Sequence, residues 1–229
     1  MIGFRWARLL PMALLFFVVP DIYSANEHEE TKTDRDVTEA TACHVDETHE
    51  DFSLKIFMGQ FIEAVKSRDI KRIERLLDTE FRYGFGGGDR DDFLADMEQR
   101  RELWEELDTL LALGGCFVGP DNFVVPYSFL LEIPEESCAD FDCHVIVGNR
   151  VNVRVTPDIN SQISFQLSYN IVRVENREKM GKNTWLGIAT LDGKKGYVHR
   201  KYVRHPLDYR MGFKRDHGAW IAEWLSSGD

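Results

Sequence analysis

Apolar residues recur at helical spacing through the first half of the folded chain and at alternate positions through the second. Two early runs have intervals of three or four residues: Phe57, Phe61, Val65, and then Ile70, Ile73, Leu76, Leu77. One face of an α-helix repeats at this interval, so the pattern predicts two amphipathic helices joined as a hairpin.

A third helix is predicted between Asp89 and Gly114. Its apolar positions fall on one helical face: Phe93, Met97, Trp104, Leu107, Leu111. Asp89 stands where an N-cap is expected, and Gly114-Gly115 stands where the helix should end. Two short strands, at 116–118 and 123–127, are predicted on either side of a Gly-Pro-Asp-Asn turn.

From Val147 the apolar positions alternate with polar ones, which is the pattern of half-buried strands. Strands are predicted at 151–155, 163–167 and 171–174, and Asp192-Gly193 predicts the turn of a hairpin. Five short strands in about sixty residues favour a small closed barrel. Alternation within 213–224 predicts one more hairpin after the barrel.

These elements predict an α+β fold with an inserted all-β module. The helical region is 52–146, the barrel is 147–204, and the C-terminal hairpin is 205–229. We expect this hairpin to pair with the strands near 117–127 and so complete the helical region. A length of 229 residues with 43% hydrophobic residues supplies enough apolar material for such cores, which excludes global disorder.

The first 25 residues have the layout of a secretory signal peptide. Arg5 and Arg8 precede an apolar run of about a dozen residues, and small residues Ser24 and Ala25 follow it. An uncleaved anchor is disfavoured because the run is shorter than the roughly 20 residues that cross a bilayer. No later apolar run is long enough to predict a transmembrane span, so a periplasmic or secreted protein is expected.

Charge is distributed unevenly along the chain. The net charge of −11 disfavours binding to nucleic acid or to an anionic bilayer. Residues 26–51 hold ten acidic and two basic residues and no aromatic one, which predicts a flexible acidic leader. The helical region 52–146 carries −10 and residues 147–229 carry +6. This contrast also allows the barrel to act as a docking module for the helical region or for a partner protein.

Four cysteines are candidates for disulfides in an oxidising compartment: Cys43, Cys116, Cys138, Cys143. Three pairings are possible. Cys138 and Cys143 are favoured as a local pair, which leaves Cys43 with Cys116. A metal site at Cys43, His44 and His49 is disfavoured because a second, well-spaced ligand pair is missing from the sequence. Neither a metal nor a cofactor is expected.

The glycine-rich stretch 84–88 has two interpretations. Glycine amides before a helix can bind phosphate, but no Lys-Ser or Lys-Thr follows them and the next residues are acidic. A tight turn that needs positive φ explains the glycines without a ligand, so a turn is favoured.

The second half of the chain resembles the bacterial SH3 domain between Val147 and Arg204. The resemblance rests on an ordered set of short motifs: Val151-Asn152-Val153-Arg154, Pro157, Trp185, Asp192-Gly193, Gly196-Tyr197-Val198, Tyr202-Val203. Val155-Thr156 stands where the family usually has Ser-Gly, so the first turn is expected to differ. The resemblance implies an extracytoplasmic barrel that binds cell-wall peptides or is attached to cell-wall enzymes, and it does not imply catalysis.

Binding by such a barrel would use rigid aromatic rings. The candidates are four aromatic residues and one cation: Tyr169, Trp185, Tyr197, Tyr202, Arg154. Trp185 and Tyr197 could instead be core residues of their strands. Five further basic residues could attract the carboxylates of wall peptides or simply form a solvated face: Lys194, Lys195, Arg200, Lys201, Arg204. The expected partner is a peptidoglycan peptide or another envelope component.

A catalytic alternative is a cell-wall hydrolase or an accessory subunit of one. It would use Cys116 as nucleophile and His144 or His217 as base. The context is poor, because Cys116 precedes a strand rather than a helix N-terminus that would lower its pKa. Carboxylate pairs that could hydrolyse glycosides are too numerous to single out. The sequence therefore favours an exported, non-enzymatic protein without identified catalytic residues.

Overall fold

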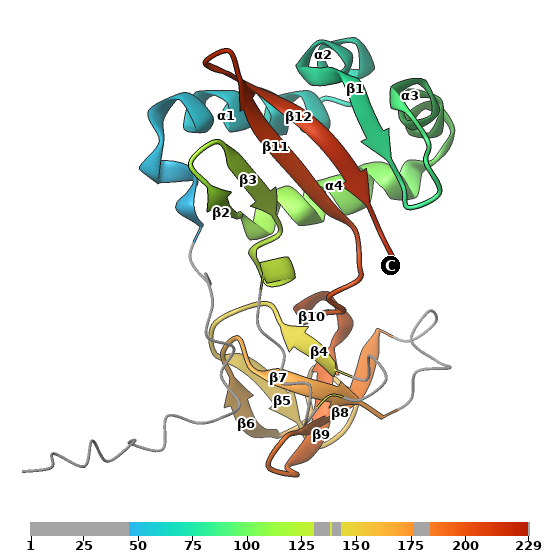
Figure 1. The fold of residues 1–229 in the computed structure, drawn as a ribbon. Coiled ribbons are helices and arrows are strands. Elements are labelled where there is room, and N and C mark those ends of the chain that lie inside the picture. The colour runs from blue at the N-terminus through green and yellow to red at the C-terminus, as the bar shows by residue number, and fades with distance from the viewer. Residues whose placement is uncertain (1–45, 131–137, 139–142, 176–183, 229) are drawn as a thin grey trace, which may run out of the picture. The chain divides into compact units, whose positions relative to one another are not determined.

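The computed structural model describes residues 46–130, 138, 143–175 and 184–228. The described chain is α+β, with α-helices and two β-sheets (Figure 1). The signal peptide predicted at 1–25 lies outside the described residues, as does the acidic leader up to residue 45. No helix in the described ranges is both long and apolar enough to cross a membrane.

Four α-helices form the helical region. Their bounds are α1 Phe52–Lys66, α2 Ile70–Leu76, α3 Arg90–Gln99 and α4 Arg101–Leu113. The predicted pair of helices before residue 77 is confirmed by α1 and α2, which join through Ser67, Arg68 and Asp69. Asp69 caps α2 by accepting a hydrogen bond from the Arg72 N–H at 2.9 Å.

The prediction of a single long helix from Asp89 to Gly114 is wrong, because the helix is interrupted at Arg100. Asp89 does cap α3 in a reciprocal capping box with Asp92, and Gly114 ends α4 at φ 72 as expected. Arg100 has extended backbone angles, and the helix axis restarts at the next residue. The Trp104 indole N–H donates to the Met97 carbonyl at 2.7 Å. This carbonyl, close to the interruption, is the hydrogen-bond acceptor for the buried indole N–H. Apolar periodicity continues across the break, which hides it from sequence.

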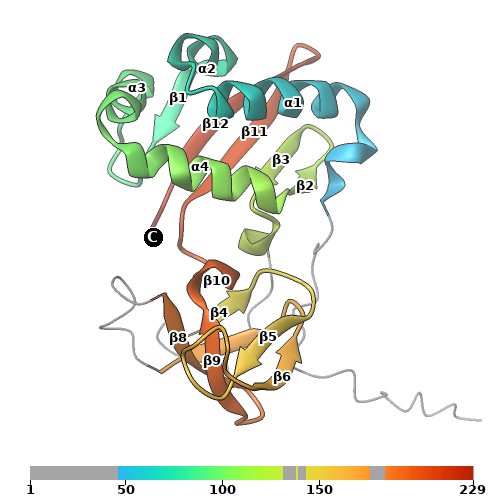
Figure 2. The same cartoon turned by 180° about the vertical axis from the view of Figure 1, so that it is seen from behind.

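The first sheet has five strands in the order β1-β12-β11-β3-β2. Their bounds are β1 Leu77–Tyr83, β2 Cys116–Gly119, β3 Asn122–Val125, β11 Arg210–Asp216 and β12 Ala219–Ser226. Helices α1 and α4 cover one face of this sheet (Figures 1 and 2). Phe57 and Phe61 of α1 pack edge-on against Phe213 of β11 with ring centroids 5.8 and 5.5 Å apart, which places the core between helices and sheet.

The C-terminal hairpin, which alternation predicted, pairs with β3, one of the strands expected near 117–127. Met211, Gly212 and Phe213 of β11 stand opposite Val125, Val124 and Phe123 of β3 in an antiparallel ladder. Segments nearly ninety residues apart in sequence thus share one sheet, with the second sheet's strands between them in the chain. Strand β1, which runs parallel to β12, was not predicted because its Asp and Glu residues weaken the strand signal.

Residues 46–51 depart from the flexible leader that composition predicted. They form a short 3-10 helix, η1 Glu47–Glu50, and the N-cap of α1. Glu47 Oε2 accepts the Phe117 N–H at 2.7 Å, and the Glu47 N–H donates to the Gly115 carbonyl at 2.9 Å. These acidic side chains are ordered because they accept hydrogen bonds from backbone N–H groups of β2 and α1.

The second sheet has seven strands in the order β10-β4-β7-β8-β9-β5-β6. Their bounds are β4 Cys143–Ile146, β5 Val151–Arg154, β6 Ile163–Leu167, β7 Ile171–Val174, β8 Trp185–Thr190, β9 Lys195–His199 and β10 Val203–Arg204. The predicted hairpin at Asp192-Gly193 is confirmed as the β8–β9 connection. Its apolar core is formed by alternate strand residues, among them Val153, Val172, Ile188 and Val198.

This sheet does not form the closed barrel that strand spacing predicted. Among the described residues, β6 and β10 stand at opposite ends of the order and no pairing joins them. β10 is only two residues long and its ladder is with β4 alone, so it offers little backbone for a closing ladder. The sheet therefore retains strand edges, which a closed barrel would remove.

Candidate functional site

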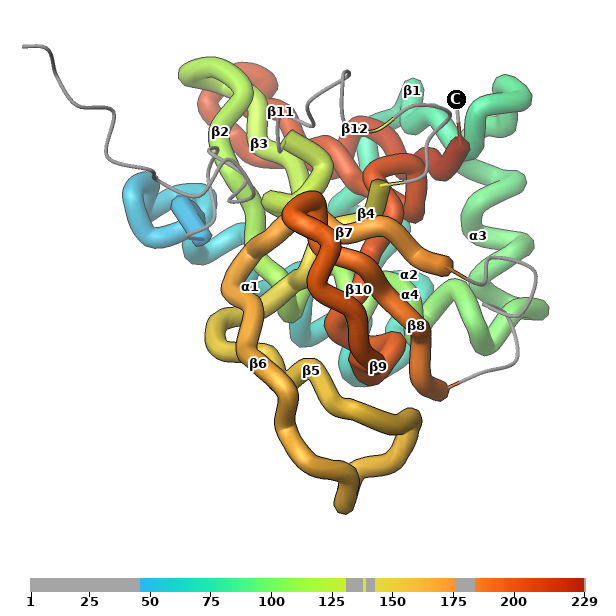
Figure 3. The backbone as a smooth tube through the Cα atoms, turned by 90° about the horizontal axis from the view of Figure 1, so that it is seen from below, coloured from blue at the N-terminus to red at the C-terminus, as the bar shows by residue number. Residues whose placement is uncertain are grey.

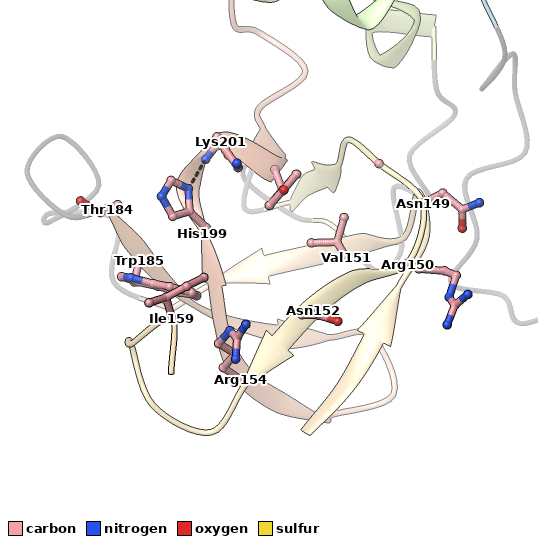
Figure 4. A pocket seen from close by; sticks show the side chains of 12 residues that line it. Asn149, Arg150, Val151, Asn152, Arg154, Ile159, Thr184, Trp185, His199 and Lys201 are labelled. Atoms are coloured by element: carbon pink, nitrogen blue, oxygen red, sulfur yellow. Dashed lines mark hydrogen bonds between the residues drawn. The ribbon is translucent and has the colours of Figure 1, made fainter. Parts of the chain in front are cut away.

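A pocket of about 530 Å³ opens on the seven-stranded sheet (Figure 4). The β4–β5 segment at 148–150, strand β5, the β5–β6 loop, the start of β8 and the segment from the end of β9 through η6 Arg200–Tyr202 supply its walls. In Figure 4, Trp185 and Ile159 lie at one end and Asn149 and Arg150 lie at the other. The volume is within the range of small-ligand pockets.

Three aromatic rings form a row along one wall. Register in the β8–β9 ladder places Trp185 directly opposite His199, and their ring centroids are 5.5 Å apart with planes at 74°. The His199 ring then meets the Tyr202 ring at 6.4 Å and 70°. All three side chains are half-buried, so each ring presents part of its surface to the pocket. Such rings supply contact area at small entropic cost.

His199 also fixes the geometry of the segment that follows it. Its Nδ1 accepts the Lys201 backbone N–H at 3.3 Å and so caps the 3-10 helix η6. An accepting Nδ1 leaves the proton of the neutral ring on Nε2. The short helix places the Lys201 ammonium 4.8 Å from the centroid of the Tyr202 ring, where cation and ring attract each other.

The charged residues of the pocket are all basic. Arg150, Arg154 and Lys201 line it, and no Asp or Glu is among its described lining residues. Arg154 Nη1 donates to the Ser161 carbonyl at 2.5 Å, which ties the cation to the β5–β6 loop. A concave site with cations and without carboxylates creates a local positive potential, although the whole chain is acidic.

An apolar lip stands beside the cations. Ile159 projects from the β5–β6 loop, lines the pocket and is 64% exposed. With Trp185 it gives one end of the pocket an apolar surface (Figure 4). The pocket is therefore amphipathic, with ring and aliphatic surface at one end and cationic groups along the rest.

Three of the five predicted binding residues meet in this pocket: Arg154, Trp185 and Tyr202. Tyr169 lies outside its lining and packs edge-on against Tyr127 at 6.0 Å. Tyr197 also lies outside, in the β9 ladder opposite Gly187 and Arg154.

Sequence reasoning missed several contributors to the pocket, among them His199, Ile159 and the cation Arg150. The β8–β9 hairpin gives a signal for His199 only through its register: a two-residue turn at Asp192-Gly193 would set Arg200 opposite Trp185, whereas the observed ladder sets His199 there. Ile159 gave no such signal, because an isolated apolar residue in a turn is common on protein surfaces.

The other basic candidates have different surroundings. Lys194 pairs with Asp192 at 2.8 Å and Lys195 pairs with Glu175 at 2.5 Å. The hydrogen bond from Lys194, together with one from Thr190, lowers the pKa of Asp192. Arg204 is 6% exposed and its Nη2 lies 2.7 Å from Glu106 Oε1. Of these basic residues, Lys201 alone lines the pocket.

The predicted Cys138–Cys143 disulfide is confirmed. Cys116 is also disulfide-bonded, while Cys43, its predicted partner, lies outside the described residues. A disulfide sulfur carries no thiolate, so Cys116 is not available as a nucleophile. Of the two proposed bases, His144 is buried against His205 at 4.9 Å, and His217 is exposed at the β11–β12 turn. The hydrolase hypothesis thus loses its named nucleophile.

The structure also describes parts of two disfavoured sites, the metal site near His49 and the phosphate site at the glycine-rich stretch 84–88. His49 Nδ1 lies 2.9 Å from the Asp46 carbonyl, whereas Cys43 and His44 fall outside the described residues. Within the described ranges, no group of three or more potential metal ligands occurs. The glycine-rich stretch is a turn, as favoured: Gly84 and Gly87 have φ 68 and 83, and the Tyr83 N–H donates to the Gly88 carbonyl at 2.7 Å.

Comparison with protein-family models and with curated proteins gave no match. The functional assignment therefore depends on the pocket, on the disulfide and on the motifs of the sequence.

Proposed function

We propose that this protein is an exported, non-catalytic envelope protein whose seven-stranded sheet binds cell-wall peptides through the cationic aromatic pocket. The observation that carries the proposal is the pocket's composition: Arg150, Arg154 and Lys201 beside Trp185, His199 and Tyr202, with no carboxylate among its described lining residues. A ligand that combines free carboxylates with apolar surface complements such a site.

The sequence resemblance to bacterial SH3 domains supports the ligand class. That family commonly binds cell-wall peptides, and the resembling motifs include Arg154, Trp185 and Tyr202, which line the pocket. Peptidoglycan stem peptides carry free carboxylates, so they match the cations by charge.

Export is supported by two independent features. The first 25 residues carry basic, apolar and small residues in the order of a secretory signal. The Cys138–Cys143 disulfide fits an oxidising compartment, because cytosolic thiols are usually kept reduced. We place the protein in the periplasm or outside the cell.

The proposal is tested by cosedimentation of the purified mature protein with insoluble peptidoglycan. Release of soluble muropeptides is assayed in the same tubes, at low and at moderate salt. We expect retention without release, and weaker retention at higher salt because screening reduces charge attraction. Retention with release would replace this proposal with a wall hydrolase. No retention at either salt would reject wall binding and favour docking to a partner protein.

A further inference from the structure

The four edges of the two described sheets differ in how they are protected against pairing. The β2 edge is covered where the Phe117 N–H donates to Glu47 Oε2, and the β10 edge is only two residues long. The β1 edge strand carries the charged side chains of Asp78, Glu80 and Arg82. Short strands, charges and coverings are the usual means of preventing unwanted strand addition.

Strand β6, the fourth edge, has none of these protections among the residues that the structure describes. Its sequence, Ile-Ser-Phe-Gln-Leu over Ile163–Leu167, contains no charged residue and no proline. In the part of the chain that the structure describes, β6 ends the strand order and β5 is its sole ladder partner. Figure 3 shows the β5–β6 hairpin projecting from the rest of the sheet. An uncharged edge of this length can accept another strand.

Exposed apolar side chains gather on the same hairpin. Val155, Ile159 and Ile163 are 53%, 64% and 44% exposed, and they account for three of the seven large exposed apolar residues that the structure describes. Apolar side chains beside an open edge can contact alternate residues of an added strand. The hairpin therefore combines unpaired backbone with side-chain contact surface.

The β6 edge is continuous with the pocket. Gln166 of β6 donates from Nε2 to Asn152 Oδ1 at 2.7 Å and accepts from Arg150 Nε at 3.4 Å. Both partners, Asn152 and Arg150, line the pocket. Gln166 thus joins the cationic pocket to the edge strand on one surface.

We infer that an extended anionic peptide whose carboxylates occupy the pocket continues along β6 as an added strand. This inference rests on the proposed function and adds the binding mode: backbone hydrogen bonds at β6 would supply affinity with little sequence dependence, and the pocket would supply the selection for negative charge. A second copy of this chain is disfavoured as the occupant, because residues 147–229 carry +6 and two such surfaces repel each other.

The test is hydrogen–deuterium exchange of the full mature protein with and without soluble muropeptides prepared from purified peptidoglycan. We expect exchange at Ile163–Leu167 to slow at least about tenfold when muropeptide is added, together with slower exchange at the β8 and β9 segments of the pocket. Protection of the pocket without β6 would overturn the added strand and leave the proposed function standing. Absence of protection at both would reject the proposed function and this inference together. Protection of β6 that rises with protein concentration and needs no muropeptide would identify a second copy and overturn the peptide.

A pair of variants separates edge pairing from folding. Ser164 falls at the irregularity between the Val153–Phe165 and Arg154–Ile163 pairs and has no partner in that ladder. Ser164→Pro removes one backbone donor from the strand, and Ser164→Ala is the matched control. We expect muropeptide affinity to fall at least about fivefold in the proline variant and to stay within twofold in the alanine variant, with circular dichroism unchanged in both. Equal affinities in two folded variants would overturn the inference.

Discussion

The rings of Trp185 and His199 stand opposite each other in the β8–β9 ladder, with centroids 5.5 Å apart and planes at 74°. This pair begins the aromatic wall of the pocket, and Tyr202 continues it. The register of the hairpin fixes the positions of these two rings, so this part of the wall is held by backbone pairing rather than by a loop. A preformed wall loses little conformational entropy when a ligand binds.

Removing the first ring of this wall should weaken binding without unfolding the protein. Trp185 is half-buried, and Trp185→Ala is expected to reduce retention on peptidoglycan at least about tenfold, because interface tryptophans often contribute 2 kcal/mol or more. The control is Phe85→Ala, which removes a 72% exposed ring outside the pocket. Cosedimentation measures both, and thermal unfolding checks the fold. Equal retention of the two variants would contradict the assignment of Trp185 to the site.

The Asp51 carboxylate should make stability depend on pH in acid. Hydrogen bonds from the Ser53 hydroxyl and the Leu54 N–H, together with Arg215, lower the pKa of Asp51 from 3.8 to about 2. A lowered pKa in the folded state means that this contribution is complete above about pH 5 and is lost as the pH falls toward 2. Asp51→Asn keeps an N-cap but has no charge to lose.

The free energy of unfolding in urea, measured from pH 7 to pH 2, tests this dependence. The wild-type protein should lose stability relative to Asp51→Asn as the pH falls below about 5. Asp51→Ala should be less stable than the wild type by about 1 kcal/mol at pH 7, the usual value of an N-cap. Parallel wild-type and Asp51→Asn curves would contradict the role of the charge.

Close packing of Trp224 on Gly212 should make this glycine intolerant of a side chain. A Cβ built on Gly212 would overlap the Trp224 indole on the neighbouring strand. Gly212→Ala is expected to destabilise the protein by about 1–3 kcal/mol, as overpacking does in well-packed sites. The same change should cost less when Trp224→Ala is already present. Equal costs in the two backgrounds, measured by urea unfolding, would show that the indole is not the obstacle.

Local signals predicted most helices, strands and turns because each depends on neighbouring residues. The Asp89 cap, the Gly114 helix end and the hairpin at Asp192-Gly193 follow from capping and turn chemistry alone. The break at Arg100 was hidden, because the apolar spacing of Met97 and Trp104 continues across it.

Features that depend on distant residues were harder to predict. Strand β1 is stabilised by the last strand of the chain, and the order at Glu47 comes from its bond to Phe117 seventy residues away. The prediction of a closed barrel was wrong for the same reason, because the spacing of strands in the sequence does not show which strand edges pair. The pocket was predicted in part. Residue type indicated Arg154, Trp185 and Tyr202, which line it. The strand register places Tyr197 outside the lining, and residue type alone did not show this.

The central claim, that the pocket binds a negatively charged wall peptide, is tested most directly by reversing its exposed charges. Arg150→Glu with Lys201→Glu changes two pocket cations, and Lys55→Glu with Lys71→Glu makes the same change in net charge on exposed positions of α1 and α2. The measurement is the dissociation constant for soluble muropeptide at low salt. We expect the pocket variant to bind at least about tenfold more weakly, which corresponds to about 1.4 kcal/mol, and the helix variant to match the wild type. Equal weakening in both variants, or none in either, would contradict a cationic binding pocket.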